Sequence, residues 1–138
     1  MDIEIIEESY RYTLTREIAR GGMGAVYEAQ LAGAEGFQKK VALKVILEQM
    51  MYDKQFEEMF IAEAKLVANL IHQNIAQVYQ LGRYQDSFYI AMEYIDGVNL
   101  EEFFVKHEER NIKVSVEIVT FIVSRVCRGL SYAHNKRD

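Results

Sequence analysis

The sequence predicts an α+β fold in which strands come first along the chain and helices follow. Alternating apolar and polar residues recur between residues 12 and 46, a helical apolar pattern covers about residues 53–70, and two more helical patterns fill residues 100–134. Half of the 138 residues are hydrophobic, which suits one compact domain of ordinary size.

Composition and charge exclude several classes of protein. A net charge of −5 with no basic excess argues against a nucleic-acid partner. The single cysteine, Cys127, indicates a reduced setting without disulfides, and its apolar surroundings predict a small buried hydrophobe. No segment is long and apolar enough to span a bilayer, and residues 1–9 lack the pattern of a signal peptide. We therefore expect a cytoplasmic protein without membrane contact in these residues.

The first two expected strands form a hairpin around a glycine-rich turn. Residues 12–18 and 26–30 alternate in polarity, and the sequence Gly-Gly-Met-Gly lies between them at residues 21–24. Glycine tolerates positive φ and leaves the backbone N–H groups bare, so such a turn can lie against phosphate oxygens. An ordinary flexible hairpin is the alternative that this turn alone leaves open.

The third expected strand, residues 41–46, carries a charge inside an apolar run. Alternation places Ala42, Lys44 and Ile46 on one face and the remaining apolar side chains on the other. A lysine in the middle of such a strand needs an anion close by, because an unpaired charge against apolar surface is costly.

The helix expected over residues 53–70, with Asp53 as its N-cap, offers that anion. The side chains that recur at helical spacing are Phe56, Phe60, Glu63, Val67 and Leu70. Truncating one partner of a buried pair costs about 3–5 kcal/mol, so we predict that Glu63 in this buried stripe pairs with Lys44. Alternatively, Glu63 lies at the edge of the stripe and reaches solvent, which leaves Lys44 unexplained.

A second hairpin is expected after this helix. Residues 75–81 and 87–94 are predicted to be antiparallel strands around a turn-rich connection at residues 82–86. His72 precedes the hairpin and is expected to close the helix by hydrogen bonding. No second His or Cys stands at ligand spacing from it, and we expect no metal site in these residues.

Two helices are expected in the last third. Asn99 and Glu102 form the pattern of a capping box, which predicts a short amphipathic helix over residues 100–109. Ser115 starts a last helix that is apolar on most sides. Its apolar side chains are Val116, Ile118, Val119, Phe121, Ile122, Val123, Val126, Cys127 and Leu130. A helix of this kind belongs in the middle of a protein, but no later sequence in this chain is available to pack against it. We therefore expect self-association through this helix or poor solubility.

These segments together resemble the start of a protein kinase. The glycine turn, Val26 and the V-A-L-K run at residues 41–44 match the first three strands of the family's small lobe, and the wording GGMGxVYxA is most similar to bacterial serine/threonine kinases. In the family's G-x-G-x-x-G-x-V pattern, Ala19 takes the place of the first glycine. An L-x-H-P-N-I segment, with Gln73 in place of proline, and a G-L-x-Y-A-H segment continue the family's order up to His134.

The resemblance implies a kinase-like small lobe, with a five-stranded antiparallel sheet and one main helix, at residues 1–95. The first helices of a truncated large lobe follow at residues 96–138. It makes Lys44 and Glu63 the catalytic pair, with the glutamate orienting the lysine toward the α- and β-phosphates of ATP. The nucleotide-binding residues that it implies are Ile18, Ala19, Gly21, Gly22, Met23, Gly24, Val26, Ala42, Lys44, Met92, Glu93, Ile95 and Asn99.

By the same resemblance, the second hairpin ends in the kinase hinge. Met92 is the gatekeeper, and backbone groups of Glu93 and Ile95 meet the edge of adenine, which offers a donor and an acceptor side by side. The apolar walls of the base site are Ile18, Val26 and Ala42. Asn99 lies near the ribose in this interpretation, whereas its capping-box pattern makes it a helix cap, and both assignments stay open.

The implied function is transfer of the ATP γ-phosphate to protein hydroxyls by a serine/threonine kinase. Phosphoryl transfer depends on Mg²⁺, whose ligands are expected in the missing large lobe, because H-R-D-x-x-x-x-N and D-F-G motifs are absent from the chain. We therefore expect the isolated chain to be inactive and to bind ATP weakly. The alternative is a non-catalytic, kinase-related module for nucleotide binding or protein interaction.

Overall fold

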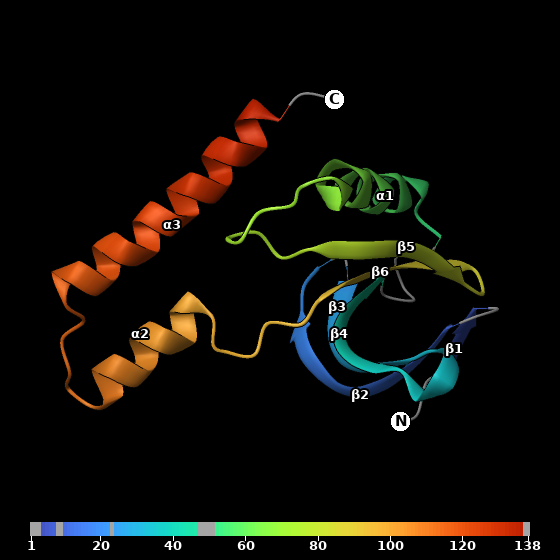
Figure 1. Cartoon of the computed structure of the whole chain (residues 1–138), viewed down its shortest axis with the longest axis horizontal. Helices are drawn as coiled ribbons and strands as arrows, with labels where there is room; N and C mark the ends of the chain where they lie inside the picture. Colours follow the sequence, from blue (N-terminus) through green and yellow to red (C-terminus); the bar gives the residue numbers. More distant parts are fainter. Residues whose placement is uncertain (1–3, 8–9, 23, 47–51, 137–138) are drawn as a thin grey trace. The chain divides into compact units, whose positions relative to one another are not determined.

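A computed structural model describes residues 4–7, 10–22, 24–46 and 52–136 of the chain (Figure 1). The chain divides into two compact units, residues 1–71 with 76–94, and residues 72–75 with 95–138. The described elements of the first unit are β1 (Glu4–Glu7), β2 (Tyr10–Arg20), β3 (Gly24–Ala32), the 3-10 helix η1 (Ala34–Gly36), β4 (Gln38–Ile46), α1 (Lys54–Ala68), β5 (Val78–Tyr84) and β6 (Ser87–Glu93). Those of the second unit are α2 (Leu100–Glu109) and α3 (Val116–Asn135).

The first unit is built on one antiparallel sheet with the strand order β1-β2-β3-β4-β6-β5. The five strands expected from the sequence are β2 to β6, so the predicted α+β fold is confirmed. The described sheet also contains β1, which pairs with β2 from Glu4↔Thr13 to Glu7↔Tyr10. The sequence did not predict β1, because four residues with a glutamate at each end are too short to show an alternating pattern.

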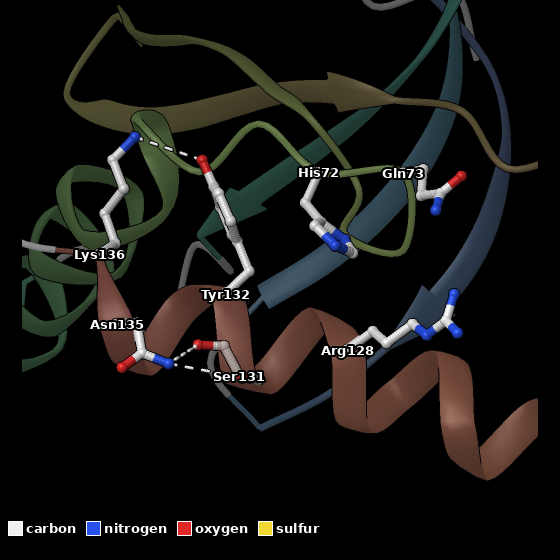
Figure 2. Close-up of a pocket in the computed structure, with 7 residues that line it drawn as sticks. All are labelled: His72, Gln73, Arg128, Ser131, Tyr132, Asn135 and Lys136. Carbon is white, nitrogen blue, oxygen red and sulfur yellow. Dashed lines mark hydrogen bonds between the residues drawn. The ribbon is translucent and has the colours of Figure 1, made fainter.

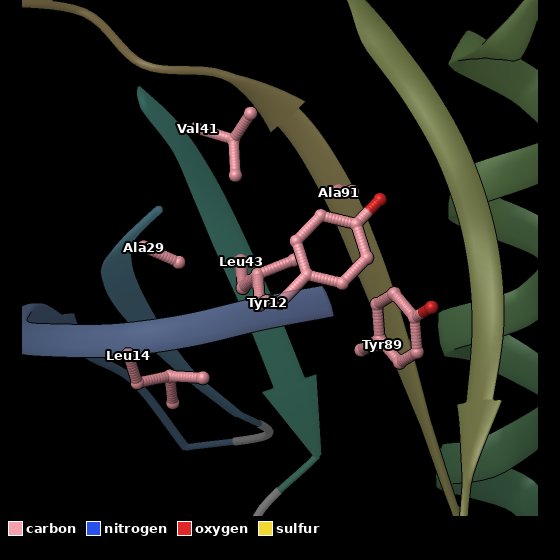
Figure 3. Close-up of a cluster of buried hydrophobic side chains, with 7 residues drawn as sticks. All are labelled: Tyr12, Leu14, Ala29, Val41, Leu43, Tyr89 and Ala91. Carbon is pink, nitrogen blue, oxygen red and sulfur yellow. The ribbon is translucent and has the colours of Figure 1, made fainter. Parts of the chain in front are cut away.

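The two faces of β4 follow the predicted alternation. Val41, Leu43 and Val45 point into a cluster of buried side chains on one face, whereas Ile46 joins a second cluster on the other face. The seven buried members of the first cluster, drawn in Figure 3, are Tyr12, Leu14, Ala29, Val41, Leu43, Tyr89 and Ala91. This cluster ties together β2, β3, β4 and β6 and forms the main core of the first unit.

A glycine in β5 makes room for a tyrosine of this core. A Cβ atom built on Gly82 would lie 2.2 Å from Cζ of the buried Tyr89 ring, so only glycine leaves space for that ring. The predicted turn at residues 82–86 is therefore wrong at its start, because β5 continues to Tyr84. The chain reverses at Gln85, whose φ of 52° lies in the left-handed region. Strand β5 also begins later than expected, at Val78.

Helix α1 lies alongside β5 and β6 (Figure 1). The predicted N-cap is confirmed, because the Asp53 carboxylate accepts a hydrogen bond of 3.0 Å from the Gln55 N–H. Phe60 and Ala64 are buried and pack with Ile46 and Ile90 of the sheet in the second cluster. The helix ends at Ala68, two residues before the expected end.

In the second unit, each of the two expected helices begins with a capping side chain. The Asn99 side chain accepts a hydrogen bond of 2.8 Å from the Glu102 N–H at the start of α2, and Ser115 Oγ accepts one of 3.3 Å from the Ile118 N–H at the start of α3.

The predicted burial of Cys127 in α3 is wrong, because its side chain is exposed. The apolar pattern of α3 predicts burial, but the residues one turn before and after Cys127, at positions 123, 124, 130 and 131, are exposed as well. None of the helices in the described ranges is both long and apolar enough to cross a membrane.

Residues 72–75 pack against α3 within the second unit. Gly129 is buried, and a Cβ atom there would lie 3.3 Å from the Asn74 carbonyl oxygen. The His72 ring lies 5.1 Å from the Tyr132 ring, beside an open pocket (Figure 2). His72 Nδ1 accepts a hydrogen bond of 3.1 Å from the Asn74 N–H. His72 therefore has a structural hydrogen-bonding role as predicted, although it closes the turn at residues 72–75 and not the end of α1.

Candidate functional site

The strand register gathers candidate site residues on one face of the sheet. Val26 of β3 stands opposite both Ala19 of β2 and Lys44 of β4. Ala42 of β4 stands opposite Met92 of β6. Because Ala42, Lys44 and Met92 have the same parity in these ladders, they share the face on which α1 lies. Sequence reasoning placed these residues together, and the first unit does so.

The predicted ion pair between Lys44 and Glu63 is confirmed. Lys44 Nζ lies 2.7 Å from each carboxylate oxygen of Glu63 and 5.7 Å from the centre of the Phe60 ring. The side chain of Lys44 is 21% exposed and that of Glu63 is 47% exposed. An ion pair this open to water contributes about 1 kcal/mol or less to stability. Its main consequence is geometric, because it fixes where the lysine ammonium points.

The predicted burial of Glu63 is wrong. Glu63 follows Phe60 by three residues, which turns its side chain about 60° round the helix from the buried face. The stripe through Phe60 therefore continues at the buried Ala64, and Glu63 lies at the edge of the stripe. The structure combines the two interpretations of the sequence, since Glu63 reaches solvent and still pairs with Lys44.

The three described glycines of the glycine-rich turn differ in the space around them. A Cβ atom on Gly24 would lie 2.6 Å from the Val45 carbonyl oxygen, whereas one on Gly22 would meet no atom within 4 Å. The Gly21 N–H donates a hydrogen bond of 2.9 Å to the Gly24 carbonyl. None of these three glycines has positive φ, so the missing side chain, and not an unusual backbone angle, makes the space here. Met23 lies outside the described residues.

The hinge expected from the sequence begins at the end of β6. The Glu93 N–H donates a hydrogen bond of 2.8 Å to the Gln77 carbonyl, and the Gln77 N–H donates one of 3.0 Å to Glu93 Oε2. Of the remaining candidates, Ile18 is exposed in β2, whereas Ile95 and Asn99 belong to the second unit. The Asn99 side-chain oxygen serves as the cap of α2.

A row of polar side chains on the same face was missed in the sequence. Arg16 Nε lies 2.8 Å from Glu28 Oε2, and Lys40 Nζ lies 3.1 Å from Glu28 Oε1. Arg16 Nη2 donates a hydrogen bond of 3.1 Å to the Tyr94 hydroxyl. Strand alternation in the sequence could have predicted this row. Glu28 is two residues from Val26 and Lys40 is two residues from Ala42, which places both on the same face.

The charges in this row support one another. Lys40, and then Tyr94 and Arg16, hold the pKa of the Glu28 carboxyl below its usual range, although partial burial opposes them. Hydrogen bonds to Tyr94 and Glu28 raise the pKa of the Arg16 guanidinium.

Within the described ranges, no group of three or more His, Cys, Asp or Glu side chains could hold a metal ion.

Comparison with known proteins decides the family. A family model described as protein tyrosine and serine/threonine kinase matches residues 12–137, nearly the whole chain. The chain belongs to this kinase family. The resemblance expected from the glycine turn, the strand lysine and the hinge segment is therefore confirmed.

Several bacterial kinases are similar in sequence. The tyrosine-protein kinase MasK of Myxococcus xanthus is 36% identical over 123 residues, which cover 89% of this chain and 19% of MasK. The serine/threonine-protein kinase PknD of Chlamydia muridarum is 35% identical over 133 residues, which cover 91% of this chain and 14% of PknD. The chain thus spans a small part of the length of these curated relatives.

A solved kinase domain has the same fold. The crystal structure of the PknI kinase domain of Mycobacterium tuberculosis is 32% identical, with a TM-score of 0.69. The match covers 89% of this chain and 47% of the PknI chain. The kinase-like fold class predicted from the sequence is therefore confirmed, and the chain spans about half of that solved domain.

Proposed function

We propose that the chain is the ATP-binding, amino-terminal part of a serine/threonine protein kinase that transfers the ATP γ-phosphate to protein hydroxyls. The observation that carries this proposal is the ion pair of Lys44 with both oxygens of Glu63. Phosphoryl transfer needs little covalent chemistry from a protein and depends on positioning and charge neutralisation. A lysine whose ammonium is held from one side by a carboxylate is suited to neutralising phosphate oxygens on its other side.

In this proposal, Lys44 contacts the α- and β-phosphates and Glu63 orients it. The glycine turn covers the phosphates with its backbone, supported by the open space around Gly22. The residues proposed for the turn and its flanks are Ala19, Gly21, Gly22, Met23, Gly24 and Val26. An ammonium group and backbone N–H groups are donors that suit an anionic triphosphate.

The adenine base is proposed to lie against Ile18, Val26 and Ala42, with Met92 as gatekeeper. Ala42 stands opposite Met92, and its methyl group leaves more room above the sheet than a larger side chain would. The backbone of Glu93 and Ile95 supplies the hydrogen bonds to the base. For Asn99 we retain the helix cap as its main role, because its side-chain oxygen is already engaged by the Glu102 N–H, and a ribose contact would compete with that bond.

We propose the lobe division expected from the sequence, with the small lobe at residues 1–95 and the start of the large lobe at residues 96–138. The change from one compact unit to the next between Tyr94 and Ile95 supports this boundary. The Mg²⁺ ligands are proposed to lie in the remainder of a kinase domain, since the chain covers 47% of the solved PknI domain. When bound, Mg²⁺ would neutralise the charge that develops on the phosphates.

A cytoplasmic location is part of the proposal. Its support is the expected use of ATP and the single exposed thiol of Cys127, which suits a reducing compartment.

The test is phosphate transfer by the whole protein from radiolabelled ATP to a generic protein substrate. Lys44→Met is expected to lower kcat at least about a hundredfold, the range seen when one electrostatic donor is removed from an active site. Lys39→Met, on the same strand, removes an exposed lysine that lies 3.9 Å from the centre of the Tyr79 ring and is expected to leave activity near normal. Equal activity of Lys44→Met and the unmodified protein would contradict the proposal.

Two further outcomes refine the assignment. Phosphoamino-acid analysis of the product separates serine and threonine from tyrosine, which matters because one similar protein is the tyrosine-protein kinase MasK. ATP binding without any transfer by the whole protein would favour the alternative of a non-catalytic, kinase-related module. The 138-residue chain by itself is expected to transfer no phosphate and to bind ATP weakly.

We also propose that the isolated chain self-associates through α3. Phe121 and Leu130 are more than half exposed, at 58% and 51%. Large exposed apolar patches are uncommon on monomers. Leu130→Asp is expected to lower the mass measured by light scattering, whereas Leu66→Asp, at an exposed leucine of α1, is expected not to. A monomeric chain would contradict this part of the proposal.

A further inference from the structure

The row of Arg16, Glu28, Lys40 and Tyr94 connects three strands of the sheet with the residue that follows β6. Glu28 of β3 is at its centre and binds Arg16 of β2 and Lys40 of β4 through different carboxylate oxygens. The Glu28 side chain is 14% exposed, whereas those of Arg16 and Lys40 are 60% and 52% exposed. A shielded carboxylate thus holds two cations at the surface, and both cations extend toward Tyr94.

Tyr94 is held by both cations. Arg16 Nη2 donates a hydrogen bond of 3.1 Å to the Tyr94 hydroxyl, while Lys40 Nζ lies 4.9 Å from the centre of the Tyr94 ring. One guanidinium group therefore spans Glu28 with its Nε and Tyr94 with its Nη2. A lysine ammonium is a compact point charge and lacks this fork.

The residue before Tyr94 is held from the opposite side. Glu93 and Gln77 exchange two hydrogen bonds, one between their backbones and one from the Gln77 N–H to the Glu93 carboxylate. The chain at residues 93–94 is therefore held on one side by Gln77, which precedes β5, and on the other by Arg16 of β2 and Lys40 of β4. Backbone groups that must recognise a ligand bind best when their conformation is already set, because less ordering entropy is lost on binding.

We propose that Arg16, Glu28 and Lys40 are positioning residues for nucleotide binding, which act through the Tyr94 side chain to hold the backbone of residues 93–94. This inference rests on the proposed kinase function. The row touches no phosphate or base itself. Its effect is on how well the hinge backbone is prepared to accept adenine, so it changes the affinity for ATP more than the rate of phosphate transfer.

Two conservative variants of the whole protein test this inference. Tyr94→Phe removes only the hydroxyl, and Arg16→Lys keeps the charge but removes the fork. Each is expected to raise the KM for ATP about threefold to tenfold and to leave kcat within about twofold. Because both variants break the same contact, the double variant is expected to be no worse than the weaker-binding single variant. Thermal unfolding of each variant is measured in parallel, and the midpoints are expected to stay near that of the unmodified protein.

Tyr84→Phe is the matched control. It removes another tyrosine hydroxyl at the end of a strand, whose partner is Gln85 Nε2 at 3.4 Å, and its KM for ATP is expected to be unchanged. An unchanged KM in both Tyr94→Phe and Arg16→Lys, an equal rise in Tyr84→Phe, or additive losses in the double variant would overturn the positioning role and leave the proposed function intact. Unmodified protein that neither binds ATP nor transfers phosphate would overturn the proposed function and this inference with it.

Discussion

The sheet of the first unit and helix α3 of the second are similarly rich in apolar residues, but they differ in how far these residues are buried. In the sheet, Leu43 and Tyr89 are fully buried, at 0% exposure each. In α3, the only buried residue of the helix is Gly129, and Leu130 is 51% exposed. A sheet with apolar residues on two faces can cover them with its own strands and α1, whereas one helix cannot cover itself.

The comparison teaches that an apolar pattern identifies which side chains seek burial and does not identify what buries them. Alternation in β4 is satisfied within the first unit, because both faces meet other parts of that unit. The α3 pattern is equally clear but is not satisfied by residues 72–75 and α2. Four predictions test where this difference holds, in order of decreasing expected effect.

The largest effect is expected from truncating the same residue type in the two regions. Leu43→Ala should lower the free energy of unfolding by about 2–5 kcal/mol, because it opens a cavity in a closed core. Leu130→Ala should cost less than about 1 kcal/mol, because half of its side chain is already in water. Urea denaturation at low protein concentration measures both. A cost for Leu130→Ala equal to that of Leu43→Ala would mean that α3 is buried in an assembly.

The next effect concerns overpacking of the same core. Gly82→Ala should lower the free energy of unfolding by about 1–3 kcal/mol, since its Cβ would lie 2.2 Å from the Tyr89 ring. Gly22→Ala is the control, because no atom lies within 4 Å of the added methyl group. Thermal unfolding followed by circular dichroism compares the two variants. Equal stability of the two variants would mean that the Tyr89 ring can move at little cost and that the core around it is loosely packed.

A smaller effect, equal in both units, is expected from the helix caps. Asp53→Ala at α1 and Ser115→Ala at α3 should each cost about 1 kcal/mol, because each removes the acceptor for a backbone N–H. Amide hydrogen exchange at Gln55 and Ile118 measures the local loss. Since caps act within their own helix, a much larger loss at Ser115 would show that α3 depends on its ends more than α1 does.

The smallest effect is a pH dependence at Glu28. The pKa of its carboxyl is lowered in the folded chain, so its stabilising contribution is complete above the unfolded value of about 4.3. That contribution is lost as the pH falls through the lower folded value. The unmodified chain should therefore lose more stability than Glu28→Gln in acid, and the two unfolding midpoints should converge. Parallel curves down to about pH 3 would contradict the pKa shift.

Most of the fold could be predicted from local patterns. Strands β2, β3, β4 and β6 place alternate residues in the first buried cluster, and Asp53, Asn99 and Ser115 begin helices by accepting a hydrogen bond from a backbone N–H. The turn was predicted to start at Gly82 because glycine is typical of turns. In the structure Gly82 lies within a strand, and its missing side chain leaves space for the Tyr89 ring. This contact joins two strands, so no local sequence pattern indicates it. Strand β1 gave too short a pattern to be noticed.

The site was predicted in part for a related reason. Lys44 was recognisable because a charge inside an apolar strand is unusual, and it led directly to Glu63. The exposure of Glu63 depends on how α1 is rotated against the sheet, which the spacing of its apolar residues fixes only to within one helical position. The row through Glu28 depends on three strand registers and on Arg16 reaching across to Tyr94, and charged residues on strands are common enough to attract no notice singly.

Gly129 gives α3 an internal conflict between intrinsic helix propensity and fit. In a peptide of α3 alone, Gly129→Ala should raise helicity, because alanine favours a helix interior over glycine by about 1 kcal/mol. In the chain, the added methyl group would lie 3.3 Å from the Asn74 carbonyl oxygen, so part of that gain is lost to crowding. The difference between the two measurements gives the strength of the contact between residues 72–75 and α3. A selection for helix content alone would therefore choose a residue that the second unit accommodates less well.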